Sequence, residues 1–205
     1  MMKKNRILII FFFLIWNACQ CCTYHQSKEQ KSTTKEVNEI NLIDSLIRID
    51  GSIGVITTSD KYAFGDSILV FDDQKRPLSP IVIKDEYQKL TLKCLSTEGE
   101  FYKVLLEDSV IGYLAKSQPI ISFQTWNEHV LSVFAVGFDT MRNPIKKDPN
   151  NLSSEISYDI DEFYHPVKVQ GNWLQIKWGT EGNWQYGWIK WKDKDKLIIE
   201  LFYFA

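Results

Sequence analysis

The sequence predicts an all-β fold in which two tandem small β-barrels follow a short N-terminal helix and a cleaved secretion signal. Beyond Gly51 the chain consists of short β-prone runs separated by turn residues, and their lengths and spacing favour small antiparallel barrels or sandwiches over a helix-covered parallel sheet. Segment 171–191 also repeats the pattern of segment 99–117. Two sequential copies of one supersecondary unit imply two similar domains.

The first 18 residues have the pattern of a secretion signal. Basic residues lie within positions 3–6, ten apolar residues occupy positions 7–16, and the small residue Ala18 follows. A membrane-spanning helix would need about 20 apolar residues, so a processed signal is favoured over a transmembrane anchor.

The four residues from Trp16 to Cys19 resemble the lipobox of bacterial lipoproteins, in which the cysteine receives the lipid, typically including palmitate. Cys19 is therefore the expected lipidation site, although Cys21 and Cys22 follow closely. A small cysteine cluster for metal is the alternative, but no second ligand group follows at zinc-like spacing. The resemblance implies a lipid-anchored protein of the bacterial cell envelope, and Gln20 is compatible with the outer membrane.

Charge and cysteine content limit the possible partners. Cleavage before Cys19 would leave 21 basic and 26 acidic residues, a formal charge of −5. Nucleic acid is therefore an unfavourable partner. Outside the leader region Cys94 is the one cysteine, and it lies in an apolar alternating stretch. We expect it to be a small buried side chain without a disulfide.

Residues 19–41 are expected to carry the lipid and to form a flexible tether, because positions 23–35 are polar and lack apolar periodicity. Apolar residues recur at spacings of three and four from Val37 to Ile47, which predicts one short amphipathic helix. Asp50-Gly51 then ends this segment.

The two expected β-domains span residues 42–118 and 119–205, and the proline-containing segment 118–124 marks the boundary. In the first domain, strands are predicted at 53–58, 67–71, 81–83, 89–95, 101–106 and 110–115. In the second domain, they are predicted at 130–138, 166–169, 173–178, 186–191 and 196–204.

The repeat also carries a family resemblance. Its aligned positions are Gly99, Phe101, Val104, Gly112 and Tyr113 opposite Gly171, Trp173, Ile176, Gly187 and Trp188. The second copy is similar to the bacterial SH3-like domain family, whose C-terminal half reads Gly-x-Trp, a short alternating strand, a turn and Gly-Trp-Val or Gly-Trp-Ile. The resemblance is closest over residues 125–205, where Met141-Arg142-Asn143-Pro144 echoes an N-terminal family motif, and it extends in outline to 50–118. It implies small curved barrels that act as binding modules for peptidoglycan or peptides.

Five of the seven tryptophans lie within residues 171–191. Strand alternation places Leu174, Ile176 and Trp178 on one face, the expected core, and Trp173, Gln175 and Lys177 on the other. The same alternation in the next strand places Tyr186, Trp188 and Lys190 on the outer or rim side, and Trp184 in the turn joins them or caps the barrel. Trp173, Tyr186, Trp188 and Trp184 are therefore the candidate ligand-binding residues.

A small barrel has little interior for five indoles, each of which buries roughly 150 to 250 Å². Some of them should stay partly exposed, where an apolar face and a polar edge suit peptide or sugar recognition. The alternative is that they fill the seam between the domains or cover a barrel end.

The sequence favours a binding function over catalysis. The histidines lack an obvious nucleophile partner, and Cys94 lies mid-strand. The acidic residues Asp159, Asp161 and Glu162 lack the spacing of a calcium loop and indicate a solvated turn. We therefore expect no enzyme activity, no cofactor and no metal.

Three functional hypotheses follow. The first is a membrane-anchored protein whose aromatic surface binds an envelope peptide or cell-wall glycan. The second is an inhibitor or immunity lipoprotein that binds one secreted protein through a large interface. The third is a structural subunit of an envelope complex, which predicts no exposed aromatic patch.

Overall fold

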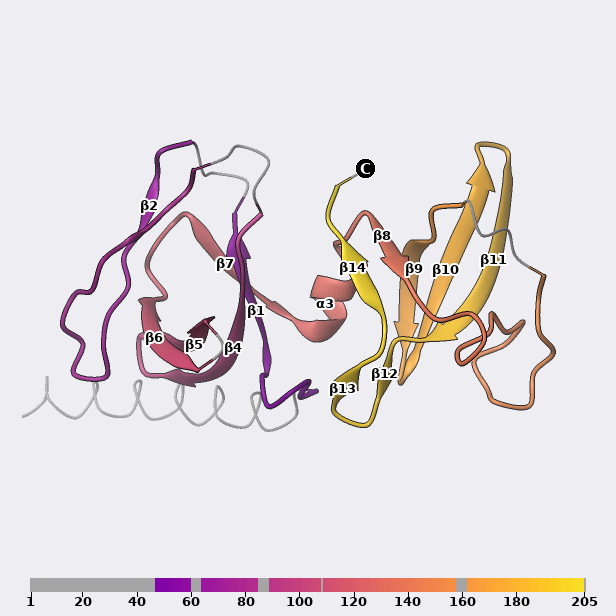
Figure 1. The fold of residues 1–205 in the computed structure, drawn as a ribbon, viewed down its shortest axis with the longest axis horizontal. Coiled ribbons are helices and arrows are strands. Elements are labelled where there is room, and N and C mark those ends of the chain that lie inside the picture. Colours follow the sequence, from indigo (N-terminus) through magenta and orange to yellow (C-terminus); the bar gives the residue numbers. More distant parts are fainter. Residues whose placement is uncertain (1–46, 60–63, 85–88, 108, 158–161, 205) are drawn as a thin grey trace, which may run out of the picture. The chain divides into compact units, whose positions relative to one another are not determined.

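The computed structural model describes residues 47–59, 64–84, 89–107, 109–157 and 162–204 (Figure 1). The signal segment, Cys19, the tether and positions 37–46 of the expected helix lie outside the described residues, so these expectations stay predictions. Residues 47–205 form one compact unit.

The described residues are mainly β-strand with one short helix, which confirms the predicted all-β class. The first half contains β1 (Gly54–Thr58), β2 (Ser67–Ile68), β3 (Ile81–Val82), β4 (Thr91–Glu98), β5 (Phe101–Glu107), β6 (Val110–Ala115) and β7 (Ile121–Thr125). The helix α3 (Trp126–Leu131) follows. The second half contains β8 (Ala135–Gly137), β9 (His165–Gln170), β10 (Trp173–Thr180), β11 (Asn183–Lys190), β12 (Lys192–Asp193), β13 (Lys196–Leu197) and β14 (Glu200–Phe202).

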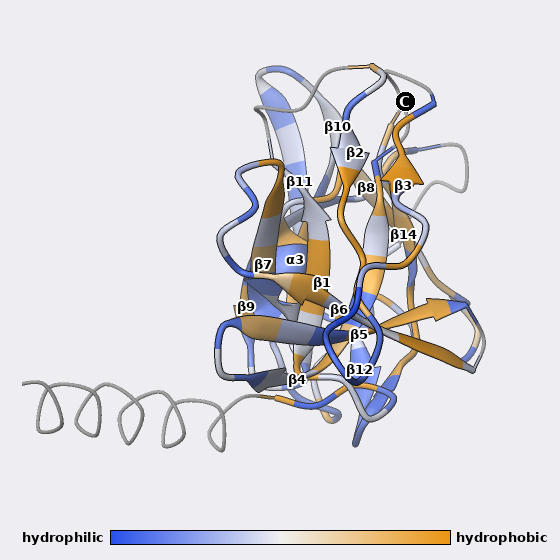
Figure 2. Cartoon of the chain, turned by 90° about the vertical axis from the view of Figure 1, so that its left-hand side faces the viewer, coloured by the Kyte–Doolittle hydropathy of each residue, from blue (hydrophilic) through white to orange (hydrophobic). Residues whose placement is uncertain are grey.

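Strand β1 is the central strand of the first sheet. The sheet has the order β6-β5-β4-β1-β7, and β1 is antiparallel to both of its neighbours. All its residues are buried, and Figure 2 shows its apolar colour among the surrounding strands. Gly54 occupies a point of close approach, because a Cβ there would collide with the carbonyl oxygen of Gln124.

The second half repeats this order of neighbours. Strands β9 to β11 form a sheet in the order β11-β10-β9, and β8 pairs with β14. A bridge between Val136 and Tyr164 joins β8 to the chain just before β9. The resulting order, β11-β10-β9-β8-β14, corresponds strand by strand to β6-β5-β4-β1-β7. Within the part of the chain that the structure describes, no sheet closes into a barrel.

The strand β7 follows the expected domain boundary at residue 118, yet it completes the first sheet. Its residues pair with β1 from Gly54↔Thr125 to Thr58↔Ile121. The chain therefore passes from the first sheet to the second half at Thr125 and Trp126. Pro119 lies in the turn that leads into β7, so the proline signal marks the start of a strand.

The helix α3 was not predicted, and its last two residues overlap the strand that the sequence predicted at 130–138. Its N-cap is Thr125, whose hydroxyl accepts a hydrogen bond from the Glu128 amide, and the Glu128 carboxylate accepts one from the Thr125 amide. This reciprocal pair is a capping box. The Thr-x-x-Glu spacing was visible in the sequence and would have located the helix.

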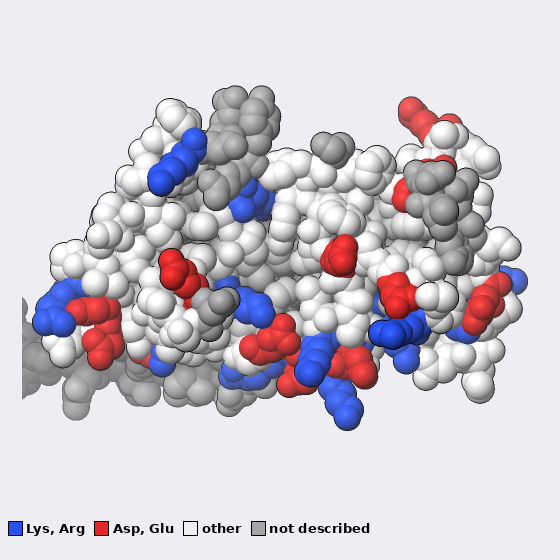
Figure 3. All heavy atoms as spheres, in the orientation of Figure 1, with Lys and Arg blue, Asp and Glu red and all other residues white. Residues whose placement is uncertain are grey.

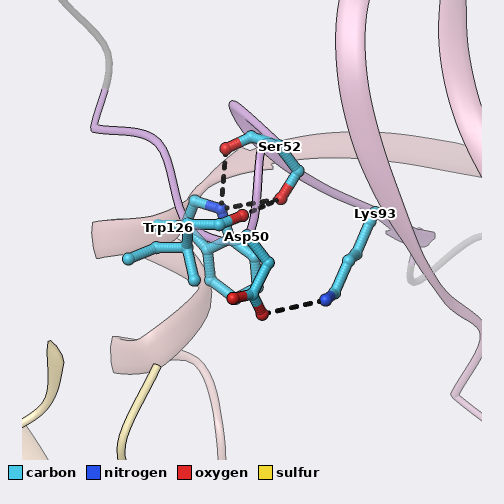
Figure 4. A network of polar contacts seen from close by, with 5 residues as sticks. Asp50, Ser52, Lys93 and Trp126 are labelled. Atoms are coloured by element: carbon cyan, nitrogen blue, oxygen red, sulfur yellow. Dashed lines mark hydrogen bonds and ion pairs between the residues drawn. The ribbon is translucent and has the colours of Figure 1, made fainter. Parts of the chain in front are cut away.

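Trp126 anchors the first turn of α3 against the start of the first half. Its indole is buried, and its Nε1 donates to both the carbonyl and the hydroxyl oxygen of Ser52, at 3.3 and 3.2 Å (Figure 4). Ser52 lies in a tight turn in which it exchanges both backbone hydrogen bonds with Ile49. Asp50 and Gly51, between them, have positive φ angles, as a two-residue hairpin turn requires.

One apolar cluster receives residues from both halves. Ile49 and Val55, at the start of the first half, are buried in the same cluster as Trp178 and Trp191 of the second. Trp126 and Val130 of α3 belong to it as well. The two halves therefore share part of their core, which explains why residues 47–205 form one unit.

The two aligned sequence segments fold into equivalent hairpins. In β5–β6, Val104 pairs with Gly112, and in β10–β11, Ile176 pairs with Gly187. These residues were aligned with one another in the sequence repeat. The second hairpin is longer, and its two-residue turn lies between Thr180 and Asn183.

Each of the two aligned glycines lies under a crossing aliphatic side chain. A Cβ at Gly112 would collide with Leu106 of β5 at 2.6 Å and approach Val70 to 3.0 Å, and one at Gly187 would collide with Ile145. The next residue along each crossing segment then forms backbone hydrogen bonds with the hairpin, Phe71 with Tyr113 and Lys146 with Trp188. Glycine is thus needed in both hairpins because aliphatic side chains, including one from a crossing segment, pack directly over it.

We expect Gly187→Ala to lower the free energy of unfolding by about 1–3 kcal/mol, because the added methyl group overpacks the contact with Ile145. Denaturant unfolding measures the change. In an Ile145→Ala background the same substitution should cost clearly less, since its steric partner is gone. An equal cost in both backgrounds would contradict the assigned contact.

Candidate functional site

The outer face of the sheet β9–β10–β11 gathers the residues that the sequence selected. The pairing register places Trp173 opposite Lys190, Gln175 opposite Trp188, and Lys177 opposite Tyr186. Gly179 lies opposite Trp184 in the next row on the same face. We call this surface the indole–lysine face, and it comprises Lys168, Trp173, Gln175, Lys177, Trp184, Tyr186, Trp188 and Lys190.

The opposite face of the hairpin is the core, as strand alternation predicted. Leu174, Ile176 and Ile189 are fully buried, and Trp178 is 2% exposed. Trp191, just after β11, is also fully buried, and its Nε1 donates to the carbonyl of Gly171 at 3.0 Å. Two of the five clustered indoles are therefore core residues.

The four candidate ligand-binding residues differ in exposure. Tyr186 is 50% exposed, and Trp173 and Trp184 are partly buried. Trp188 is only 6% exposed. The sequence-based expectation that Trp188 lies at an accessible rim differs from this observation, because its backbone pairs with the crossing segment at Lys146 and its ring is covered. Trp184 lies within β11 and not in the turn.

Each indole of the indole–lysine face has a lysine ammonium over its ring. Lys177 Nζ lies 4.4 Å from the centroid of Trp184, and Lys190 Nζ lies 5.7 Å from that of Trp173. These distances fall within the range of cation–π attraction.

The third pair crosses the whole sheet. Lys168 on β9 reaches past Gln175 on β10, and its Nζ lies 5.2 Å from the centroid of Trp188 on β11. The lysine stems thus cover apolar rings while their charges remain near solvent.

Within the described ranges, these lysines have no acidic neighbour that would neutralise them. Among the residues that the structure describes, no carboxylate lies within salt-bridge distance of Lys168, Lys177 or Lys190. By contrast, on the side drawn in Figure 3, acidic and basic side chains mix along the lower margin. The indole–lysine face is therefore a basic surface on a chain whose formal net charge is −2.

The equivalent face of the first half has the same design, but there one carboxylate forms ion pairs with the lysines. Lys75 Nζ lies 3.0 Å from the centroid of the Tyr113 ring and 5.0 Å from that of Phe101. Glu98 forms ion pairs with Lys75 and Lys103, at 3.9 and 3.5 Å. The Tyr113 phenol, and then Glu98, raise the pKa of Lys103. In the second half Gln170 stands in place of Glu98, in the row of Trp173.

Sequence reasoning placed Lys177 and Lys190 on the outer face but did not select them as site residues, and it missed Lys168. Alternation alone could have found Lys168, since it lies on the predicted strand 166–169. The pairing register, which sets Lys168 opposite Gln175, was not accessible from one sequence.

Asn143 supports the edge of the indole–lysine face. Its side-chain amide donates to the carbonyl of Lys190 at 2.7 Å and accepts from the Lys190 amide at 2.9 Å. The asparagine thereby replaces a backbone partner and keeps the end of β11 extended. Asn143 belongs to the Met-Arg-Asn-Pro segment, whose resemblance suggested a loop motif without giving this role.

The buried ionisable groups lie away from this face. Cys94 on β4 is fully buried, as predicted, and desolvation raises the pKa of its thiol to about 12. Its thiol is therefore protonated at neutral pH.

His129 of α3 is also fully buried. Its Nδ1 lies 2.8 Å from the Gln124 side-chain oxygen and its Nε2 lies 2.9 Å from the Tyr203 hydroxyl. Because an amide oxygen only accepts, Nδ1 carries the proton and Nε2 accepts from Tyr203. This pairing satisfies the neutral ring, and burial lowers its pKa to about 4.

Within the described part of the chain, no helix combines the length and apolar character needed to cross a bilayer. Comparison with models of protein families, with curated proteins and with solved structures finds no match for this chain.

The buried histidine predicts a pH-dependent stability. The ordinary histidine pKa of 6.5 applies to the unfolded chain, so between pH 6.5 and about 4 the unfolded chain binds a proton that folded His129 does not. The free energy of unfolding should therefore fall as the pH falls through this window, by up to about 3 kcal/mol. Denaturant unfolding at several pH values measures the loss. A His129→Gln variant should lack this component, and an identical pH profile in the variant would contradict it.

Proposed function

We propose that this protein is a non-catalytic, lipid-anchored binding protein of the bacterial cell envelope that uses the indole–lysine face to bind an envelope peptide or cell-wall glycan. The observation that carries the proposal is the arrangement on β9–β11, where the partly exposed Trp173, Trp184 and Tyr186 lie beside lysines that have no acidic partner among the described residues. Partly exposed aromatic residues with polar edges are characteristic of recognition surfaces.

The proposal extends to the identity of the modules, which we take to be two SH3-like domains. It is supported by the strand order β6-β5-β4-β1-β7 and its counterpart in the second half, together with the paired glycines Gly112 and Gly187. The two open sheets would be incompletely closed members of this family. Envelope localisation is supported by the resemblance of residues 16–19 to a lipobox.

A protein ligand is the second candidate, as in an inhibitor or immunity lipoprotein. It is favoured by exposed apolar side chains in the first half, namely Leu69 (53% exposed), Val82 (43%), Val110 (48%) and Ile111 (45%). Such side chains suit a protein interface more than a glycan. The structural-subunit hypothesis has less support, because it expects buried aromatic faces and Tyr186 is half exposed.

We expect the full chain to co-sediment with purified peptidoglycan and the Trp173→Ala, Tyr186→Ala double variant to be retained about tenfold less or worse, since both side chains would be central contacts. Trp188 is left unchanged because it is buried. Near-UV circular dichroism verifies that the variant is folded.

A Phe64→Ala variant is the matched control, because Phe64 is 69% exposed and lies outside the indole–lysine face. It should be retained like the wild type. If the folded double variant is retained equally well, the face is not the wall-binding site. If the wild type is not retained at all, the wall is not the ligand, and the same chain then serves as bait for a protein partner.

A further inference from the structure

The lysines of the indole–lysine face restrict the chemistry of its ligand. Each indole ring already has an ammonium over it, at 4.4, 5.2 and 5.7 Å. A neutral sugar that stacked on these rings would have to displace the lysines. A carboxylate, in contrast, could bind the ammonium groups where they are, in a charge-assisted contact.

The indole–lysine face also differs from its counterpart in the first half because it lacks one carboxylate. In the first half, the Glu98 carboxylate forms ion pairs with the ammonium groups of Lys75 and Lys103. In the second half Gln170 replaces that carboxylate, and the three lysines have no acidic partner among the described residues. An external anion can therefore supply the negative charge that Glu98 supplies internally.

The lysines lie one to a row along the strands. Lys190 of β11 lies in the row of Trp173, Lys168 of β9 in the row of Gln175, and Lys177 of β10 in the following row, with its ammonium directed to Trp184 in the row after that. Successive rows on one face of a strand are two residues, or about 7 Å, apart. An extended peptide presents alternate side chains at this same interval.

We infer that the indole–lysine face binds an acidic peptide segment in an extended conformation, with carboxylates at alternate positions facing the three lysines. The inference rests on the proposed function and names its ligand class. Tyr186, the most exposed aromatic residue of the face, lies in the row of Lys177 and would contact the peptide beside that lysine.

Fluorescence anisotropy of labelled octapeptides with the full chain tests the inference. One probe alternates Glu and Ser, and a second places the same residues in two blocks, so that composition and charge are equal. The alternating probe should bind more tightly, and its affinity should fall with added salt as the charges are screened. Two further probes are polygalacturonate, which is an anionic glycan, and a Lys-Ser alternating peptide, which has the opposite charge.

The test variant carries Lys168→Gln, Lys177→Gln and Lys190→Gln, and it should bind the alternating peptide at least about tenfold more weakly, since one charged contact alone is worth about that factor. The matched control carries the same changes at Lys84, Lys147 and Lys196, which are exposed lysines elsewhere. It should bind like the wild type.

Equal affinity for the two peptide isomers, or binding of polygalacturonate alone, would overturn the inference. So would an unchanged affinity in the test variant. If the test variant still co-sediments with the wall while the Trp173→Ala, Tyr186→Ala variant does not, the acidic-peptide inference fails and the proposed function stands. If neither variant changes binding to the peptide or to the wall, the acidic-peptide inference and the proposed function are both wrong.

Discussion

The buried indole of Trp126 is the contact on which the arrangement of residues 47–205 depends. It follows directly after β7, the last strand of the first sheet, and its Nε1 bonds to Ser52 at the start of the first half. A buried N–H without a partner would cost roughly 1–3 kcal/mol, so the chain must bring the two segments together. The same apolar cluster takes in Ile49 from the first half and Trp191 from the second. The repeated halves are thus joined through their cores, and this linkage explains why a boundary drawn from local sequence falls one strand early.

The limited interior of each half decides the role of each tryptophan. Within residues 171–191, Trp178 and Trp191 fill the core, and the other three indoles lie on the outer face, where uncovered rings would be in contact with water. Lysine side chains reduce this exposure of the indoles to water, because their aliphatic stems cover the rings and their ammonium groups remain hydrated. The same contacts that protect the indoles create a basic surface. Structural packing and ligand chemistry therefore arise from one set of residues, and in the first half that set includes a carboxylate, Glu98, which forms ion pairs with Lys75 and Lys103.

Much of the candidate site was accessible to strand alternation. The period of two correctly separated Leu174 and Ile176 from Trp173, because side chains of adjacent strand residues point to opposite faces. Alternation gives the face of a residue but not its exposure. Trp188 shares the outer face, yet the crossing segment at Lys146 and the side chain of Lys168 cover it, and both contacts come from parts of the chain outside the hairpin.

The sequence by itself determined the β class, the positions of the main strands and the equivalence of the two hairpins, because these follow from local periodicity and from glycine at fixed positions. It also contained the capping box of α3, but the apolar run that follows it from residue 130 indicated a strand. Only the tertiary structure decided that β7 completes the first sheet, that Asn143 supports the edge of β11, and that Lys168 reaches Trp188. Each of these depends on register and long-range contact. A single sequence does not encode them as a local pattern, because the partners lie tens of residues apart and are brought together by the shared core.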